Sequence, residues 1–171
     1  MIKIIGIILV IGGAAAMGLS ARARLTLRIR VLSAFSSGLD TMHSEITCML
    51  TPISELLIKL RDTAPEPVRV FYENCIQSAA CRTDMPISLI WNRAIKDADY
   101  LELKSHERQI LIDMGASLGR FEADEQGSVI MHARRAIDNC LKAAEADKLR
   151  MGKLYGSLGV VCGLAVVIML L

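Results

Sequence analysis

The sequence predicts an all-α protein: a cytoplasmic antiparallel bundle of about six helices, whose first and last helices continue into two transmembrane helices. Three observations lead to this prediction. Apolar residues recur at steps of three and four through the middle of the 171-residue chain, strand-like alternation is absent there, and each end carries a long run without charged residues. Much of the 53% hydrophobic share lies in those two runs, so the ends and the middle belong to different structural classes.

The two uncharged runs cover residues 4–21 and 154–171. At about 1.5 Å per residue each would form a helix of roughly 27 Å, close to the hydrocarbon thickness of a bilayer. The first run has a second interpretation, because a lone Lys3 followed by a short apolar core and the small residues GAAAMGLSA is also typical of a secretory signal peptide. The predicted division is a transmembrane helix over 1–21, a cytoplasmic bundle over 22–153 and a transmembrane helix over 154–171.

Basic residues flank the two runs on their inner sides, and this balance favours retained anchors over an exported N-terminus. The flanking residues are Arg22, Arg24, Arg28 and Arg30 after the first run, and Lys142, Lys148, Arg150 and Lys153 before the second. Because basic flanks stay in the cytoplasm, both termini are expected on the far side of the membrane. Glycines in both runs would allow close approach to another helix, although they could equally face lipid.

The first helix of the middle segment is predicted from about residue 22 to 50. Its apolar stripe consists of Leu32, Phe35, Leu39, Met42, Ile46 and Met49. We expect it to stop at Thr51-Pro52, where threonine can cap and proline can occupy the first turn of a second helix. The segment Ala64-Pro65-Glu66-Pro67 should end that second helix and start a third.

Three further helices complete the predicted bundle. The third runs to about Ala80, and the segment 83–86 separates it from a fourth, which carries Ile87, Ile90, Trp91 and Ile95. The fifth begins near Lys104-Ser105, with Ser105 as its cap, holds Leu103, Ile110, Leu111 and Met114, and is interrupted by Gly115 and Gly119. The last begins near Ala123, with the stripe Ile130, Ala133, Ile137, Cys140, Leu141, Ala144 and Met151. Short connections favour antiparallel neighbours.

Sites for catalysis, metals or cofactors are not indicated. The five cysteines form no CxxC pair, and the three histidines, His43, His106 and His132, are scattered. The sequence contains no phosphate-binding loop, no GxSxG and no glycine-rich dinucleotide turn. The net charge of +2 is small, and membrane topology already accounts for the arginines near the start. We therefore predict a protein that is not an enzyme and binds neither cofactor nor nucleic acid.

A set of short motifs then points to a family. The motifs are Glu45-Ile46 followed by Thr51-Pro52-Ile53 and Glu55, Trp91 in IWNRAIKD, GASLGRFE from Gly115 to Glu122 with Gln126, and Gly156-Ser-Leu-Gly159 before an aliphatic tail. In this order and spacing, and over nearly the whole chain, they resemble the stage III sporulation protein AB family.

The resemblance implies a structural role in endospore formation. Members of that family look like the cytoplasmic helical domain of the inner-membrane platform proteins of type II secretion and type IV pilus machines. By analogy the bundle would lie in the mother-cell cytoplasm at the outer forespore membrane, as part of a channel between mother cell and forespore. The expected partners are a secretion-type sporulation ATPase (stage III sporulation protein AA-like), polytopic channel subunits, the lipid bilayer and further copies of the chain. A membrane-bound regulatory or signalling protein that acts through dimerisation is the alternative.

The matched residues are candidates for structural or interaction roles, first of all as architecture. Gly119 is expected to close the fifth helix in a left-handed conformation, with Leu118 packed beneath it. Glu122 stands where the family usually has Asp, which puts a cap there in doubt, while Asp124 would place negative charge in the first turn of the last helix. Gln126 could return a hydrogen bond to the cap region. The full set is Glu45, Thr51, Pro52, Trp91, Gly115, Leu118, Gly119, Glu122, Asp124 and Gln126.

Two of these predictions concern partners. We expect Trp91, the only tryptophan, to be a core residue rather than an exposed anchor. The loop from Gly115 to Glu125 is the candidate contact surface for the ATPase or a neighbouring subunit.

Overall fold

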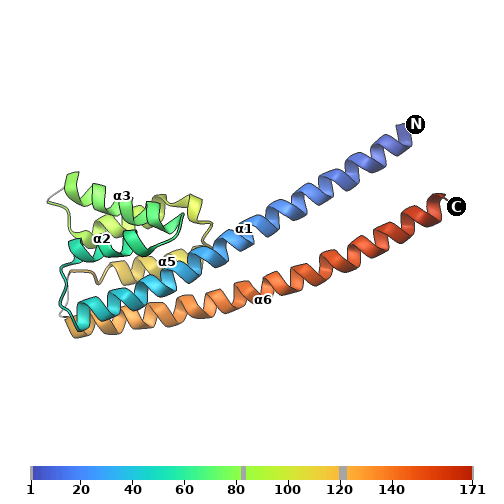
Figure 1. Cartoon of the computed structure of the whole chain (residues 1–171). Helices are drawn as coiled ribbons and strands as arrows, with labels where there is room; N and C mark the ends of the chain where they lie inside the picture. The colour runs from blue at the N-terminus through green and yellow to red at the C-terminus, as the bar shows by residue number, and fades with distance from the viewer. Residues whose placement is uncertain (1, 82–83, 120–122, 171) are drawn as a thin grey trace. The chain divides into compact units, whose positions relative to one another are not determined.

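The computed structural model describes residues 2–81, 84–119 and 123–170, and side chains for 18–81, 84–119 and 124–150. Within these ranges the chain is helical, and the all-α prediction is confirmed (Figure 1). The elements are α1 (Ile2–Thr47), α2 (Ile53–Thr63), α3 (Val68–Cys81), α4 (Ile87–Asp97), η1 (Asp99–Leu101), α5 (Ser105–Gly115) and α6 (Ala123–Leu170). The short 3₁₀ helix η1 was not predicted.

The chain forms two compact units. One is the bundle, Leu27–Leu141, and the other consists of residues 1–26 and 142–171. In the second unit Leu19 and Leu149 are largely exposed. Within the part of the chain that the structure describes, no helix has the length and apolar character needed to cross a bilayer. Of the two predicted transmembrane runs, residues 4–17 of the first and all of the second lie outside the residues whose side chains are described.

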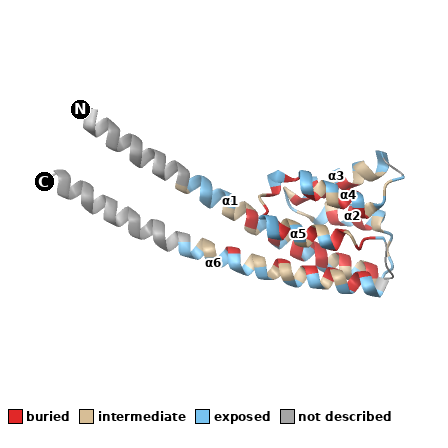
Figure 2. Ribbon diagram, turned by 180° about the vertical axis from the view of Figure 1, so that it is seen from behind, coloured by how far each residue is buried: buried red, intermediate tan, exposed pale blue. Residues whose placement is uncertain are grey.

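The core of the bundle is built on the predicted apolar stripe of α1. Figure 2 shows the buried positions concentrated within the bundle, and the stripe residues Leu32, Phe35, Leu39, Met42 and Ile46 are all buried. An aromatic cluster of Phe35, Phe71, Tyr72 and Trp91 joins α1 to α3 and α4, with ring centroids from 4.9 to 6.3 Å apart. Such edge-on contacts add to the stabilisation from burial of the rings.

Within the bundle, α1 and α6 run antiparallel. Ser36 donates a hydrogen bond to Asp138 over 2.7 Å, and Arg134 pairs with Asp40 at 2.6 Å. Because the residue number falls along α6 as it rises along α1, these two contacts fix the direction. Helices α2 to α5 pack in sequence order, α2 on α3, α3 on α4 and α4 on α5.

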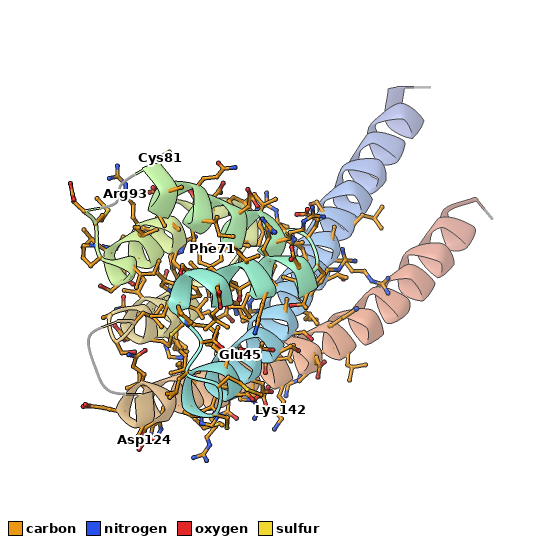
Figure 3. All side chains as sticks on the ribbon, turned by 60° about the vertical axis from the view of Figure 1, so that its left-hand side comes forward. Glu45, Phe71, Cys81, Arg93, Asp124 and Lys142 are labelled. Carbon is orange, nitrogen blue, oxygen red and sulfur yellow. The ribbon has the colours of Figure 1, made fainter. Side chains whose placement is uncertain are left out.

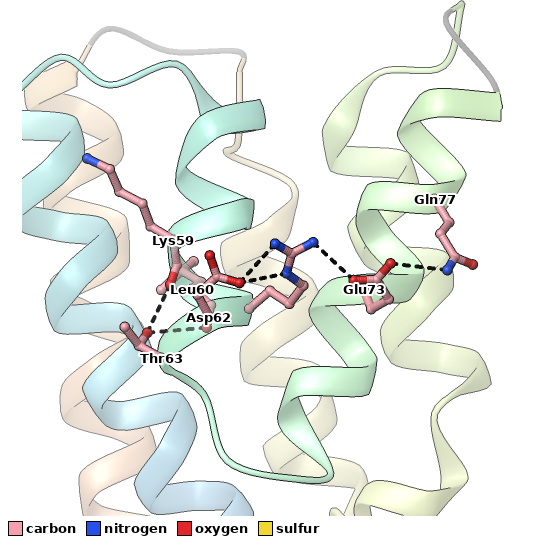
Figure 4. A network of polar contacts seen from close by, with 7 residues as sticks. Lys59, Leu60, Asp62, Thr63, Glu73 and Gln77 are labelled. Carbon is pink, nitrogen blue, oxygen red and sulfur yellow. Dashed lines mark hydrogen bonds and ion pairs between the residues drawn. The ribbon is translucent and has the colours of Figure 1, made fainter.

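A surface network links α2 to α3 (Figure 4). The Arg61 guanidinium donates to Asp62 over 2.9 Å and to Glu73 over 3.3 Å, and Gln77 donates to Glu73 over 3.2 Å. Exposed pairs of this kind contribute little to stability, because water and salt screen them. The network therefore orients the two helices more than it stabilises them.

Three local predictions were wrong. Met49 does not belong to the buried stripe, because α1 already ends at Thr47. Ser105 is not the cap of α5: Lys104 occupies that position, and its backbone N–H donates to Glu107 over 2.8 Å. Third, the stripe residues Ile110, Cys140 and Leu141 are only half-buried.

Candidate functional site

The candidate site begins where α1 ends, at a clasp formed by Glu45. The Glu45 carboxylate accepts hydrogen bonds from Lys59 at 2.8 Å and from the Thr51 hydroxyl at 2.5 Å. The Thr51 N–H also donates to the Glu45 carbonyl over 3.0 Å. The hydrogen bond from Lys59, and then that from Thr51, lowers the pKa of the Glu45 carboxyl. The clasp joins the end of α1 to the second turn of α2 and closes the loop between them.

The structure corrects the predicted roles of Thr51 and Pro52. Pro52, with φ −57° and ψ 140°, is the N-cap residue of α2, and no side chain caps this helix. The Pro52 carbonyl accepts the first helical bond, from Leu56 over 3.0 Å. Thr51 does not cap because its hydroxyl donates backwards to Glu45. Both residues still fix the bend between α1 and α2.

The clasped loop holds Leu50 in an unusual conformation. Its φ is 52°, in the left-handed region that a branched side chain rarely adopts. The side chain points outward and is 72% exposed, and its neighbour Met49 is 70% exposed. The Met49–Leu50 pair, called here the apolar tip, was missed by the sequence reasoning, since periodicity placed Met49 in the core.

At the other side of the bundle end, the chain leaves α5 through a tight turn. Gly115 is the last residue of α5. The position requires glycine, because a side chain there would strike the indole of Trp91 and lie 2.7 Å from the Asn92 amide oxygen. Leu118 is buried, as predicted. Gly119 has φ +72°, which confirms the left-handed conformation, although the helix ends four residues earlier than Gly119.

Trp91 is a core residue, as predicted. It is fully buried, and its indole N–H donates to the Leu111 carbonyl over 2.9 Å. Trp91 and Gly115 therefore hold α4 against α5 and do not belong to the surface around the apolar tip.

The last predicted residues lie at or near the start of α6. Asp124 is exposed in the first turn, where the helix dipole favours negative charge. Gln126 is buried. Glu122 lies outside the described residues, so the predicted return hydrogen bond of Gln126 to the cap region stays a prediction.

A hollow of about 180 Å³ brings several of these residues together. Its lining comes from the end of α1, the α1–α2 loop, the start of α2 and α6: Ile46, Leu50, Thr51, Pro52, Ile53 and Gln126. A methyl group at Gly119 would lie 3.8 Å from Ile53, so the turn after α5 borders the same region. The bundle end therefore combines the apolar tip, a small hollow beside it and the first turn of α6.

Comparison with known proteins identifies the family. The family model for stage III sporulation protein AB matches residues 3–171. The chain belongs to the stage III sporulation protein AB family. A solved structure described as "Stage III sporulation protein AB (SpoIIIAB)" has the same fold, with a TM-score of 0.66 and 20% sequence identity, and the match covers 72% of this chain and 98% of that chain. No curated protein matches the chain.

This family member also contains a buried ion pair that the sequence reasoning missed. Arg28 of α1 and Glu107 of α5 are 7% and 1% exposed, and the arginine Nε lies 3.0 Å from both carboxylate oxygens. A signal was present in the sequence, since Arg28 stands four residues before Leu32 in the apolar stripe, and Glu107 lies midway between Leu103 and Leu111. The pairing itself could not be read from that spacing.

Two further hollows of the sporulation protein contain scattered polar groups. One of about 460 Å³ lies between α1 and α6 and includes His43, His132, Asp124 and Arg135. Another of about 420 Å³ lies between α3 and α4, and Figure 3 labels Cys81 and Arg93 in its lining. Among the described residues, no group of three or more His, Cys, Asp or Glu is placed to hold a metal ion.

Proposed function

We propose that this sporulation protein is a non-enzymatic, membrane-anchored scaffold of the channel between mother cell and forespore. Its bundle would serve as a platform for a secretion-type ATPase and for polytopic channel subunits. By family analogy it sits in the outer forespore membrane, with the bundle in the mother-cell cytoplasm. Membership of the stage III sporulation protein AB family supports the role in sporulation.

The observation that carries the anchored arrangement is the composition of the two long helices. Helix α1 includes the uncharged run 4–21 and the first stripe of the bundle, and α6 includes the last stripe and the uncharged run 154–171. Basic residues stand between run and bundle in both helices. Such a charge balance holds the intervening domain in the cytoplasm. Two anchors restrict rotation of a domain more than one does, which suits a docking platform.

The proposal assigns docking to the end of the bundle around the apolar tip. Exposed acidic residues stand in the first turns of two helices there, Glu55 in α2 and Asp124 and Glu125 in α6. Charge of one sign on a docking face guides a partner of the opposite charge and sets its orientation.

Binding of the full-length protein in a mild non-ionic detergent to the purified secretion-type ATPase of the same organism tests the proposal. Affinity is measured without nucleotide, with ADP and with a non-hydrolysable ATP analogue. We expect the unchanged protein to bind and the Asp124→Lys/Glu125→Lys variant to bind weakly. Glu145→Lys, which reverses another exposed acid of α6, is the matched control and should bind normally.

Circular dichroism establishes that all variants keep their helices. Absence of binding by the unchanged protein under every nucleotide condition would contradict the ATPase part of the proposal. The partner would then have to be sought among the membrane subunits.

A further inference from the structure

The apolar tip is an exposed surface that the architecture of the bundle does not require. Met49 and Leu50 are adjacent and both more than two-thirds exposed, and Pro52 beside them is exposed as well. Single exposed apolar residues are ordinary on protein surfaces, whereas a contiguous group of them often marks an interaction site.

The surrounding contacts hold this loop in place despite its strain. A non-glycine residue at positive φ costs about 1–3 kcal/mol and persists only where neighbouring contacts impose it. Here the contacts come from the Glu45 clasp, with the Thr51 hydroxyl at 2.5 Å and Lys59 at 2.8 Å. The apolar tip is thus presented in a fixed position, which lowers the entropy lost when a partner binds it.

Charge around the tip narrows the choice of partner. The hollow beside Leu50 includes Gln126, and the neighbouring hollow joins Thr47 to Asp124, so the first turn of α6 borders the tip. In Figure 3, Asp124 lies at the bundle end. The first turns of α2 and α6 contribute three exposed carboxylates, from Glu55, Asp124 and Glu125. The exposed Arg135 lines the same neighbouring hollow as Asp124, so the carboxylates are in excess over this cation.

An acidic border disfavours two of the three classes of partner. A second copy of the chain meeting this surface symmetrically would bring like charges together, which costs free energy. An anionic lipid surface would repel the same carboxylates. A protein with lysine or arginine around an apolar pocket complements both features.

We propose that Met49 and Leu50 insert into an apolar pocket with a basic rim on the protein that docks at this end of the bundle. The inference rests on the proposed function for the choice of the ATPase as the first partner to test. It deepens that function by naming the two side chains that anchor the contact and the chemistry of the surface that receives them.

The test compares full-length variants in detergent for binding to the ATPase. Met49→Gln/Leu50→Asn removes the apolar side chains, and asparagine tolerates the left-handed conformation at position 50. Leu89→Gln is the matched control, because Leu89 is 54% exposed on α4. We expect the double variant to lose about tenfold or more in affinity, as for hot-spot residues, and the control to change less than about twofold. Affinity of the unchanged protein should fall as salt is raised. Equal affinity of the double variant and the unchanged protein would overturn the inference.

A second readout keeps the inference separate from the ATPase assignment. If the unchanged protein does not bind the ATPase, the same variants are introduced into a sporulating strain that lacks the gene. Sporulation lost with Met49→Gln/Leu50→Asn at normal protein level, and kept with Leu89→Gln, supports an apolar contact with another partner. Normal sporulation with the double variant overturns the inference.

Cys48, exposed next to the tip, reports on a second copy. A disulfide-linked dimer through Cys48 that disappears in Leu50→Asn would show self-association instead, and would also overturn the inference.

Discussion

Replacing Arg28 by methionine should strongly destabilise the bundle. The arginine donates from Nε to both oxygens of Glu107, and the terminal nitrogen forms a further short contact with the same carboxylate. Without Arg28, the carboxylate stays buried with the Lys104 N–H at 2.8 Å as its remaining hydrogen bond to the helix start. Breaking a buried pair in this way costs about 3–5 kcal/mol, because one buried charge is left uncompensated.

The expected shift is large enough to measure directly. With an m-value of about 1.5 kcal/mol/M, the urea midpoint should fall by about 2–3 M. Fluorescence of Trp91 reports on the bundle alone, because this is the only tryptophan and it is buried in the core. The full-length protein in non-ionic detergent is therefore suitable.

The double variant Arg28→Met/Glu107→Leu provides the control, because it removes both charges and keeps apolar volume. We expect it to recover most of the lost stability, since replacing a whole buried pair by apolar residues is often neutral or stabilising. A single variant whose free energy of unfolding lies within about 1 kcal/mol of that of the unchanged protein, or a double variant as unstable as the single one, would show that the uncompensated carboxylate is not what destabilises the bundle.

Two further predictions concern buried groups of the core. Burial raises the pKa of the Cys75 thiol to about 12, so iodoacetamide at neutral pH should label the exposed Cys48 and Cys81 in the folded protein and Cys75 only after unfolding. Peptide mass spectrometry identifies the labelled cysteines, and rapid labelling of Cys75 in the folded protein would contradict the prediction. Gly115→Ala should cost about 1–3 kcal/mol in the same urea titration, because the new methyl group would strike the Trp91 indole, and an unchanged midpoint would show that α4 and α5 can separate at little cost.

Periodicity was sufficient to predict the helices, because burial of one face governs them. The α1 stripe from Leu32 to Ile46 is buried as predicted, and so is Trp91. Where a helix stops is decided by other contacts. Helix α1 ends at Thr47 since the chain turns through Leu50 at positive φ and is fastened by the hydrogen bonds of Thr51 to Glu45. The spacing of apolar residues does not reveal these hydrogen bonds between Thr51 and Glu45, and so Met49 was wrongly predicted to lie in the core.

The candidate site was only partly predictable, because it depends on residues brought together from distant parts of the sequence. Thr51, Pro52 and Gln126 were singled out, and the structure places them around one hollow. The role of each residue was harder to predict. A threonine before a proline is a good helix cap by propensity, but the Glu45 carboxylate, six residues upstream, accepts the hydrogen bond of the Thr51 hydroxyl instead. The pairing of Arg28 with Glu107 spans 79 residues and needs the tertiary structure to be seen.

In the proposed arrangement two membrane-spanning ends hold the bundle in the cytoplasm, and the accessibility of cysteines to a reagent outside the cell tests this arrangement. A variant with Cys48, Cys140 and Cys162 replaced by alanine leaves the exposed Cys81 as the reporter of the bundle, and Ile2→Cys adds a reporter for the N-terminus. The protein is expressed in vegetative cells, where the same topology in the plasma membrane would place the N-terminus outside the cell. We predict that a membrane-impermeant maleimide labels position 2 in intact protoplasts of these cells and labels Cys81 only after permeabilisation. Labelling of Cys81 in intact protoplasts would contradict the proposed arrangement, as would release of the protein from membranes by a carbonate wash.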